Sequence, residues 1–291
     1  MRILVTGASG FSGSHVARDL ARAGHAVVGL YRRETEFLGR ALAQQGVAGL
    51  RAGLGDAAQL PGPFDAIVHT AATSPAPGVT DTMIVRDSLE GTLALLEATR
   101  RWSTKRFIFF SSLSLYGAVA GGVLDEKTPI VDPDAYGATK RLCEIMLAER
   151  ASDLPSLSLR LPGVLGPGAH RNWLSGVAAQ LRADKPVRAY NIDGAFNNAA
   201  HIDDIVRLVK RTLDREMTGA DAVVLGARGT TTVRDVIERL ARGLGVIPRI
   251  EASAQAKPLF LLSSDAAIAR WGYEPMEIGA MIDRYASEAA G

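Results

Sequence analysis

The chain begins MRILVTGASGFSG (residues 1–13), an apolar run that leads directly into three closely spaced glycines. The first five residues have the β-branched, apolar character of a buried parallel strand, and apolar residues recur at helical spacing over residues 14–23. Gly7 permits a tight turn between the two elements, Gly10 lets a phosphate approach backbone N–H groups, and Gly13 allows the helix to pack on the strand. Because the helix N-terminus would face the anion, the segment predicts a bound dinucleotide.

Short apolar runs then alternate with helical stretches, which is the pattern of a doubly wound parallel sheet. Strands are expected at residues 3–6, 26–30, 49–52, 66–69, 106–111 and 156–161, and helices at 14–23, 35–45, 83–101 and 136–150. This order corresponds to two mononucleotide-binding halves in succession. The expected fold class is α/β, a Rossmann-type doubly wound parallel sheet with a smaller C-terminal substrate-binding lobe.

The pattern changes at residues 163–168, GVLGPG, which are expected to form a loop. Helices near 173–183, 203–213, 233–242 and 277–289 follow, with strand-like runs at 222–225 and 249–252. We expect residues 1–162 to form a dinucleotide-binding domain that residues 196–226 rejoin. Residues 163–291 should mainly form the substrate-binding lobe.

Charge and hydropathy limit the class of partner. The chain has 33 Lys and Arg against 31 Asp and Glu, a formal net charge of +2, and the charges are scattered. This pattern favours a small-molecule substrate over nucleic acid or an anionic membrane. The start has no basic segment followed by an apolar one, and no apolar run approaches the roughly 18 residues of a spanning helix. We therefore expect a soluble, cytoplasmic protein.

Two features could indicate metal or redox chemistry. Cys143 is the single cysteine, and we interpret it as a structural thiol in a helix. His201 precedes Asp203 and Asp204, a combination that can bind metals. We prefer the interpretation that the aspartates cap the following helix, so no metal site is expected.

The segment YGATK places Tyr136 and Lys140 four residues apart, on one face of a helix. A free tyrosine has a pKa near 10, and a neighbouring cation favours its phenolate form. Ser112 ends an apolar strand, where ligands bind in open α/β sheets, so it is a candidate for orienting a substrate oxygen beside Tyr136. Capping or turn hydrogen bonding is its alternative role. Ser114 and Tyr116 follow in a loop and are expected to line the substrate pocket.

Together these motifs resemble the extended short-chain dehydrogenase/reductase family, also called the NAD-dependent epimerase/dehydratase family. Its markers run nearly end to end: TGASGFSG (6–13), DAIVHTAA (65–72), GT (91–92), SSLSLYG (111–117), YGATK (136–140), RLPGVLGPG (160–168) and HIDD (201–204). The resemblance implies Tyr136 as the catalytic acid/base, Lys140 as its pKa partner and a ligand of the nicotinamide ribose, and Ser112 as the substrate-oriented hydroxyl. It also implies cofactor contacts from Ser9, Phe11, Ala71, Ala72, Leu161 and Val164.

The end of the second strand departs from the pattern of NAD-preferring relatives, which carry an acidic residue there for the adenosine ribose. This chain has Tyr31, Arg32 and Arg33 instead. A carboxylate would repel a 2′-phosphate, whereas guanidinium groups can hold one, so NADP(H) is favoured over NAD(H) as cofactor. Solvated loop charges are the alternative interpretation of the two arginines. Ser88 stands where many relatives have an asparagine, which leaves the role of that position open.

Two further departures concern the substrate. Asn197 replaces an arginine that nucleotide-sugar epimerases present to the substrate diphosphate, which weakens the case for a nucleotide sugar. Arg171, after His170, could supply a replacement charge. The family's dehydratases place an acidic pair where this chain has Leu113 and Ser114, which argues against dehydration.

The main hypothesis is an NADP(H)-dependent oxidoreductase that transfers hydride to or from a carbonyl or secondary alcohol. Its substrate could be a 4-keto sugar, nucleotide-linked or not, or another small ketone or aldehyde. The alternatives are an NAD(P)-dependent nucleotide-sugar epimerase and a non-catalytic dinucleotide-sensing or partner-binding protein, although the retained Tyr/Lys pair argues against the last. Helices 83–101 and 136–150 resemble the pair that relatives use for a four-helix-bundle homodimer. Their apolar residues could equally be internal core: Leu89, Leu93, Leu96, Leu142 and Met146.

Overall fold

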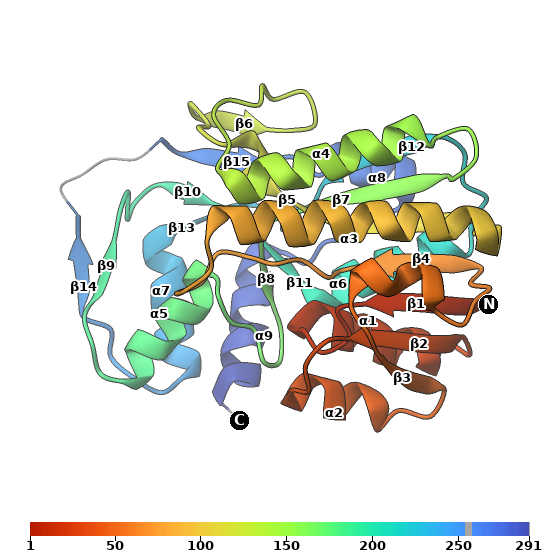
Figure 1. Cartoon of the computed structure of the whole chain (residues 1–291). Helices are drawn as coiled ribbons and strands as arrows, with labels where there is room; N and C mark the ends of the chain where they lie inside the picture. Colours follow the sequence, from red (N-terminus) through yellow and green to blue (C-terminus); the bar gives the residue numbers. More distant parts are fainter. Residues whose placement is uncertain (254–257, 291) are drawn as a thin grey trace. The chain divides into compact units, whose positions relative to one another are not determined.

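A seven-stranded sheet in the order β12-β7-β5-β4-β1-β2-β3 dominates the computed structural model, which describes residues 1–253 and 258–290 (Figure 1). β1 pairs in parallel with β2 and β4, β2 with β3, and β4 with β5. The predicted Rossmann-type α/β fold is confirmed. The strands are β1 (Arg2–Thr6), β2 (Ala26–Tyr31), β3 (Val47–Arg51), β4 (Ala66–His69), β5 (Arg106–Ser112), β7 (Ser156–Leu161) and β12 (Ala220–Val224).

Three of the helices that connect these strands begin at polar caps. Thr35 caps α2 (Glu36–Leu42), Thr80 caps α3 (Asp81–Trp102) and Asp134 caps α4 (Ala135–Glu149), each side chain accepting a hydrogen bond from a backbone N–H in the first turn. Helices α3 and α4 lie side by side (Figure 1). Two 3₁₀ helices, η1 (Leu54–Gln59) and η2 (Leu113–Tyr116), complete this region.

Two differences from expectation concern the start of the first helix and the segment after β7. Helix α1 (Phe11–Arg22) begins three residues earlier than predicted, because Gly10 rather than Gly13 is its N-cap. Residues expected to form a loop include a short strand, β8 (Gly163–Leu165), which pairs in parallel with β11 (Ala199–His201). The partner strand lies more than 30 residues further along the chain. The three residues of β8 are too few to show a strand pattern by themselves, so the sequence did not indicate this strand.

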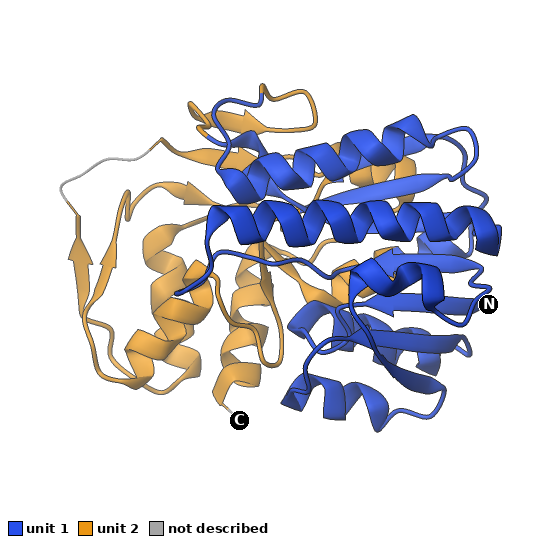
Figure 2. Ribbon diagram, viewed as in Figure 1, with its two compact units in different colours: residues 1–117, 130–160, 209–223 blue, residues 118–129, 161–208, 224–291 orange. Residues whose placement is uncertain are grey.

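The chain divides into two compact units (Figure 2). The first comprises residues 1–117, 130–160 and 209–223, and the second comprises 118–129, 161–208 and 224–291. Residues 118–129 group with the second unit, which the sequence did not indicate, and the returning segment is 209–223 rather than 196–226. The first unit has a core in which apolar residues of β1, β4 and β5 meet α3 and α4, including Leu4, Ile67, Phe107, Leu95 and Leu147.

The second unit packs around helices α5 (Trp173–Arg182), α7 (Val233–Gly243) and α9 (Ile278–Ala290), whose core includes Leu181, Ile237 and Met281. Two-stranded sheets join distant segments of this unit, pairing β6 with β15, β8 with β11, β9 with β14 and β10 with β13. Its other elements are β6 (Gly122–Leu124), β9 (Val187–Ala189), β10 (Ala195–Phe196), β13 (Thr231–Thr232), β14 (Ile250–Ala252), β15 (Phe260–Leu262) and α8 (Asp265–Trp271). Helix α6 (Ile202–Leu213) spans the boundary between the units.

Within residues 1–253 and 258–290, no helix combines the length and apolar character needed to cross a membrane.

Candidate active site

The glycine turn after β1 has little room for side chains. Gly7 has a φ of +73°, and a Cβ there would lie 2.9 Å from the backbone of Ala71. A Cβ on Gly13 would lie 2.2 Å from the Gly7 carbonyl oxygen, so helix α1 packs directly on the turn. The Gly10 N–H donates to that same oxygen at 2.8 Å. The tight turn and the close helix packing expected of these glycines are therefore present.

The start of α1 suits an anion. Among the described residues no side chain caps this helix, and its first turn contains no acidic residue, so the positive end of the helix dipole is not offset there. A Cβ on Gly10 would meet only the Gly7 oxygen, at 3.3 Å, so an approaching phosphate would not be blocked by the protein. Phe11 is buried, and the Ser9 carbonyl accepts a hydrogen bond from Thr35. The turn thus fits a dinucleotide pyrophosphate.

Arg32 lies beyond the end of β2 and contacts a carboxylate that the sequence analysis did not identify. Its Nη1 is 3.6 Å from Oδ2 of Asp87 on α3, and Thr73 donates to the same oxygen at 3.2 Å. A hydrogen bond from Arg86 is the main reason that the pKa of the Asp87 carboxyl lies below its usual range. Asp87 is therefore charged at neutral pH and offsets part of the charge of Arg32, while Arg33 is exposed.

The predicted catalytic side chains meet at the carboxyl end of β5. Lys140 is buried, and its Nζ donates to the Phe110 carbonyl at 2.6 Å and lies 5.6 Å from the centre of the Tyr136 ring. Ser112 ends β5 and caps η2, accepting a hydrogen bond from the Ser114 N–H and donating to the Ser114 hydroxyl, each at 3.1 Å. The serine therefore has the capping role considered as its alternative, and the Tyr/Lys pair shares one helix face as expected.

Gly137 explains why the start of α4 approaches the Ser112 turn so closely. A Cβ at this position would lie 2.1 Å from the Ser114 carbonyl oxygen, so any other residue would push Tyr136 away from the turn. Sequence reasoning missed this role, although the glycine directly after the tyrosine was a visible signal.

A buried histidine links the glycine turn to the central helix α3. His69 Nδ1 is 2.7 Å from the Thr6 hydroxyl and its Nε2 is 3.1 Å from the Thr92 hydroxyl. The Thr92 hydroxyl donates to the Ser88 carbonyl, so we infer that His69 carries its proton on Nε2 and donates it to Thr92. Burial, assisted by the charge of Lys140, lowers the pKa of His69 to about 3. This neutral histidine thus joins β1, β4 and α3 by hydrogen bonds, and it was not singled out from the sequence.

Two residues expected at the substrate pocket are buried, and their side chains form hydrogen bonds within the protein. Tyr116 is fully buried, and its hydroxyl accepts from Arg160 at 2.7 Å. Asn197 is 5% exposed, and its amide pairs with the main chain of Leu262 in both directions, at 2.8 and 2.9 Å. Both side chains thus make hydrogen bonds within the protein, and their contact with substrate stays a prediction. Arg171 is exposed, with a φ of +58°.

The remaining cofactor residues implied by the resemblance belong to both units. Ala71 is half-buried and Ala72 exposed after β4, in the first unit. Leu161 is buried and Val164 half-buried, and both belong to the second unit.

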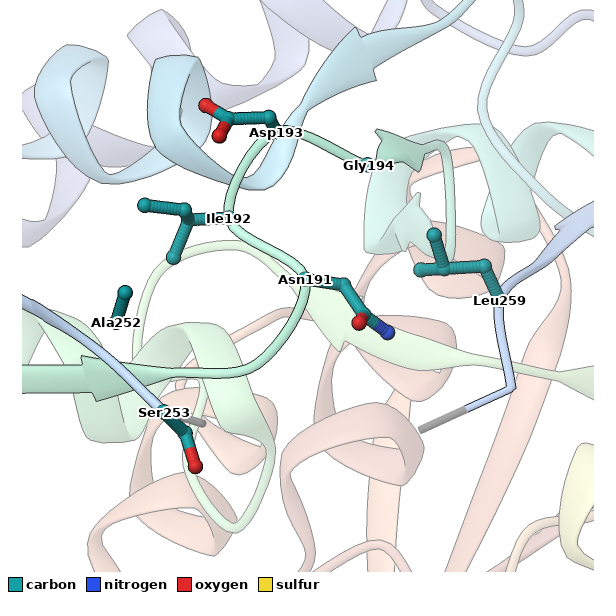
Figure 3. A pocket seen from close by; sticks show the side chains of 7 residues that line it. All are labelled: Asn191, Ile192, Asp193, Gly194, Ala252, Ser253 and Leu259. Atoms are coloured by element: carbon teal, nitrogen blue, oxygen red, sulfur yellow. The ribbon is translucent and has the colours of Figure 1, made fainter. Parts of the chain in front are cut away.

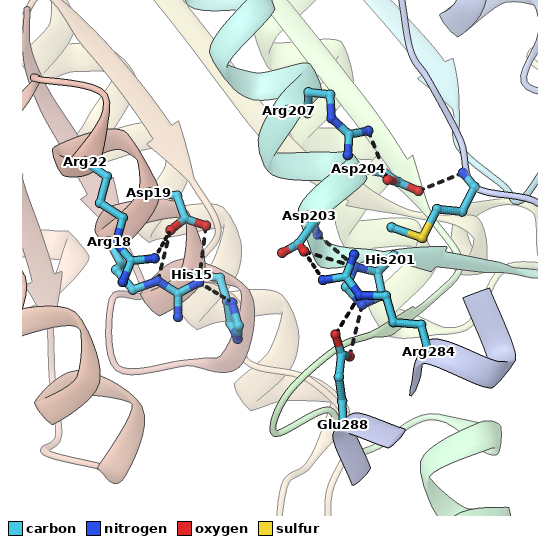
Figure 4. A network of polar contacts seen from close by, with 11 residues as sticks. His15, Arg18, Asp19, Arg22, His201, Asp203, Asp204, Arg207, Arg284 and Glu288 are labelled. Atoms are coloured by element: carbon cyan, nitrogen blue, oxygen red, sulfur yellow. Dashed lines mark hydrogen bonds and ion pairs between the residues drawn. The ribbon is translucent and has the colours of Figure 1, made fainter. Parts of the chain in front are cut away.

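The aspartates after His201 make structural contacts (Figure 4). His201 Nδ1 accepts from the Asp203 N–H at 3.2 Å and its Nε2 is 3.1 Å from Glu288. Asp204 accepts from Arg207 at 3.1 Å and from the Met276 N–H at 2.9 Å. In the part of the chain that the structure describes, no group of three or more His, Cys, Asp or Glu side chains is arranged to hold a metal ion.

The second unit contains an open cavity of about 370 Å³ beside the β9–β10 connection (Figure 3). Among the described residues, its lining contains none of the predicted catalytic side chains and comprises Asn191, Ile192, Asp193, Gly194, Ala252, Ser253 and Leu259.

Comparison with known proteins defines the class to which this site belongs. The NAD dependent epimerase/dehydratase family matches residues 3–226, and the chain belongs to that family. It is thus an enzyme of the extended short-chain dehydrogenase/reductase type, as the motifs predicted, and its family supports a nicotinamide dinucleotide as cofactor.

Several relatives carry specific names. A probable UDP-glucuronate 4-epimerase of Rhizobium meliloti is 30% identical over 72% of this chain and 67% of its own. A UDP-glucose 4-epimerase of Streptomyces lividans is 27% identical over 92% of this chain and 89% of its own. Among solved structures, a UDP-glucuronic acid 4-epimerase from Bacillus cereus in complex with NAD superposes with a TM-score of 0.84 at 22% identity, covering 99% of this chain and 98% of that one.

Proposed function

We propose that the protein is a nucleotide-sugar 4-epimerase that retains its nicotinamide dinucleotide through turnover. The observation that carries the proposal is the placement of Tyr136, Lys140 and Ser112 at one strand end in a chain whose named relatives are UDP-sugar 4-epimerases. Those names favour the epimerase alternative over the main sequence hypothesis of net oxidation or reduction.

Each residue would have a defined task. The N–H groups at the start of α1 would hold the pyrophosphate, and the bound nicotinamide would supply the hydride acceptor and donor. The Tyr136 oxygen would take the proton of the sugar C4 hydroxyl and later return it, while the Lys140 ammonium favours the phenolate that accepts it. The Ser112 hydroxyl would turn its proton away from the Ser114 hydroxyl and donate it to the same substrate oxygen. Because hydride and proton both return to the sugar, the reaction needs no second redox partner.

The test uses purified protein, UDP-glucose and UDP-glucuronate. We expect interconversion of the C4 epimers with no net change in nicotinamide absorbance, and a fall in kcat of about 10²–10⁴-fold in Tyr136→Phe with dinucleotide affinity unchanged. Net consumption of reduced cofactor in proportion to product would instead favour the oxidoreductase. A fully active Tyr136→Phe enzyme would refute the assigned chemistry.

A preference for NADP(H) is the second proposal, and the two arginines after β2 favour it. No carboxylate follows β2 directly, and the Arg32 side chain is 61% exposed, so it can reach a 2′-phosphate. The solved relative named with NAD is a reason to test this directly. We expect Arg32→Ala to weaken NADP⁺ binding about tenfold with little effect on NAD⁺, a loss of about 1.4 kcal/mol. Arg40→Ala, which removes an exposed arginine of α2, is the matched control. Selective thermal stabilisation of the unmodified protein by NAD⁺ would contradict the preference.

We further propose a homodimer formed by α3 and α4 as a four-helix bundle. Leu93 and Leu142 are 50% and 45% exposed on these helices, and Ile145 is also exposed, whereas Leu96 belongs to the internal core. Leu93→Glu should convert a dimer into a monomer in sedimentation experiments. Ile247→Glu, at a residue that is 91% exposed in the second unit, should not. A monomeric unmodified protein would rule the interface out.

A further inference from the structure

A buried ion pair lies one helical turn beyond Lys140. Glu144 on α4 is 5% exposed and Arg160 on β7 is 6% exposed. Arg160 Nε donates to Glu144 Oε1 at 3.1 Å and its Nη2 to Oε2 at 2.7 Å, a bidentate arrangement. Ser111 donates to Oε1 at 2.7 Å, and Arg141 approaches Oε2 at 3.3 Å. The carboxylate is thus surrounded by hydrogen-bond donors.

This pair is joined to the elements that carry the candidate catalytic groups. Glu144 follows Lys140 by four residues, so both side chains lie on one face of α4. Lys140 binds the Phe110 carbonyl and Glu144 binds the next residue, Ser111, directly before Ser112. α4 is therefore hydrogen-bonded to two of the last three residues of β5.

Lys140 and Arg160 are both close enough in the fold to be candidates for pairing with the Glu144 carboxylate. A buried carboxylate requires a cationic partner, and a lysine one turn away is an obvious candidate. If Lys140 turned to Glu144, its charge would no longer favour the Tyr136 phenolate. Arg160 already occupies the carboxylate, because its planar guanidinium gives each carboxylate oxygen a hydrogen bond of its own.

We propose that Arg160 is a positioning residue: by neutralising Glu144, it leaves the charge of Lys140 available to Tyr136. The proposal rests on the proposed function only in taking Tyr136 as the proton-transfer group.

The other groups near Lys140 and Glu144 come from several elements. His69 on β4 is neutral, since burial lowers its pKa to about 3. The Cys143 thiol on α4 interacts electrostatically with both Lys140 and Glu144. Burial raises the pKa of this thiol, so the thiol is also neutral. Tyr116 on η2 accepts from Arg160, and the Arg141 side chain is 42% exposed, where solvent screens its charge.

The experiment follows the ionisation of Tyr136 by near-ultraviolet absorbance in the dinucleotide-bound protein. Each variant is compared with the same variant carrying Tyr136→Phe. The difference between the two absorbance titrations isolates Tyr136, because the other tyrosines contribute equally to both. Arg160→Met should raise the pH of Tyr136 ionisation by about one unit, because Glu144 then captures Lys140. Glu144→Gln should lower it, because an uncompensated guanidinium remains nearby. The double variant should return close to the original value, and Arg141→Met, the matched control, should shift it much less.

Opposite shifts that cancel in the double variant would support the proposal, since a purely structural role would not produce them. Shifts in the same direction, or none, would overturn it. If Arg160→Met does not fold, Glu144→Gln and the double variant still decide, because the double variant contains no unpaired buried carboxylate. The pH profile of epimerase turnover should move in parallel. Opposite ionisation shifts without turnover on nucleotide sugars would refute the proposed function and leave this inference standing.

Discussion

Gly13→Ala tests how closely helix α1 must approach the glycine turn. The added Cβ would lie 2.2 Å from the Gly7 oxygen, 2.6 Å from the Gly7 carbonyl carbon and 2.7 Å from the Thr70 hydroxyl. Two of these atoms are backbone and cannot rotate away, so helix and turn would have to separate by about 1 Å. Overpacking of this kind costs about 1–3 kcal/mol, against the roughly 1 kcal/mol that alanine gains over glycine in a helix. We expect a net loss of up to about 2 kcal/mol.

The assay is urea denaturation together with calorimetric titration of the dinucleotide. Gly39→Ala is the matched control, because Gly39 lies in α2 and its added Cβ would meet nothing within 4 Å. That variant should gain about 0.5–1 kcal/mol. Gly13→Ala should also bind dinucleotide at least about tenfold more weakly, because the helix N-terminus moves away from the turn. A Gly13→Ala protein that equals the control in stability and binds the cofactor normally would refute the packing argument.

Three further predictions concern stability. The pKa of His69 is about 3 in the folded protein, against an ordinary value of 6.5. Between these pH values the unfolded chain binds a proton that the folded protein does not. The contribution of His69 to the free energy of unfolding is therefore complete above about pH 6.5 and falls as the pH drops toward 3. Urea denaturation should show a weaker pH dependence for His69→Gln, and an unchanged dependence would contradict a buried neutral histidine. Asp134→Ala removes the 2.7 Å cap on the Gly137 N–H and should cost about 1 kcal/mol in thermal denaturation, whereas an unchanged melting temperature would show that the cap contributes nothing. Asn197→Leu leaves the N–H and C=O of Leu262 without their amide partner and should lower the free energy of unfolding by about 1–3 kcal/mol for each unpaired group. Full activity with a large loss of stability would support a structural role for Asn197. Lost activity with unchanged stability would instead indicate contact with substrate.

Local patterns along the chain were sufficient to predict the strand, glycine turn and helix at residues 2–22, and the Tyr136–Lys140 pair on one face of α4. These features depend on residues within a few positions of one another, so backbone geometry and helical spacing decide them. The order of motifs was sufficient for the family as well.

Tertiary contacts decided what the isolated polar residues do. Tyr116 and Asn197 looked like pocket residues, yet their partners, Arg160 and Leu262, are 44 and 65 residues away in the chain. Strand β8 escaped prediction for the same reason, since its partner strand β11 begins at residue 199. A polar group or a short apolar run has many possible partners, and only folding selects one. Arg160 begins one of the quoted motifs, but its pairing with Glu144 was not predicted, because it depends on β7 and α4 meeting beside β5.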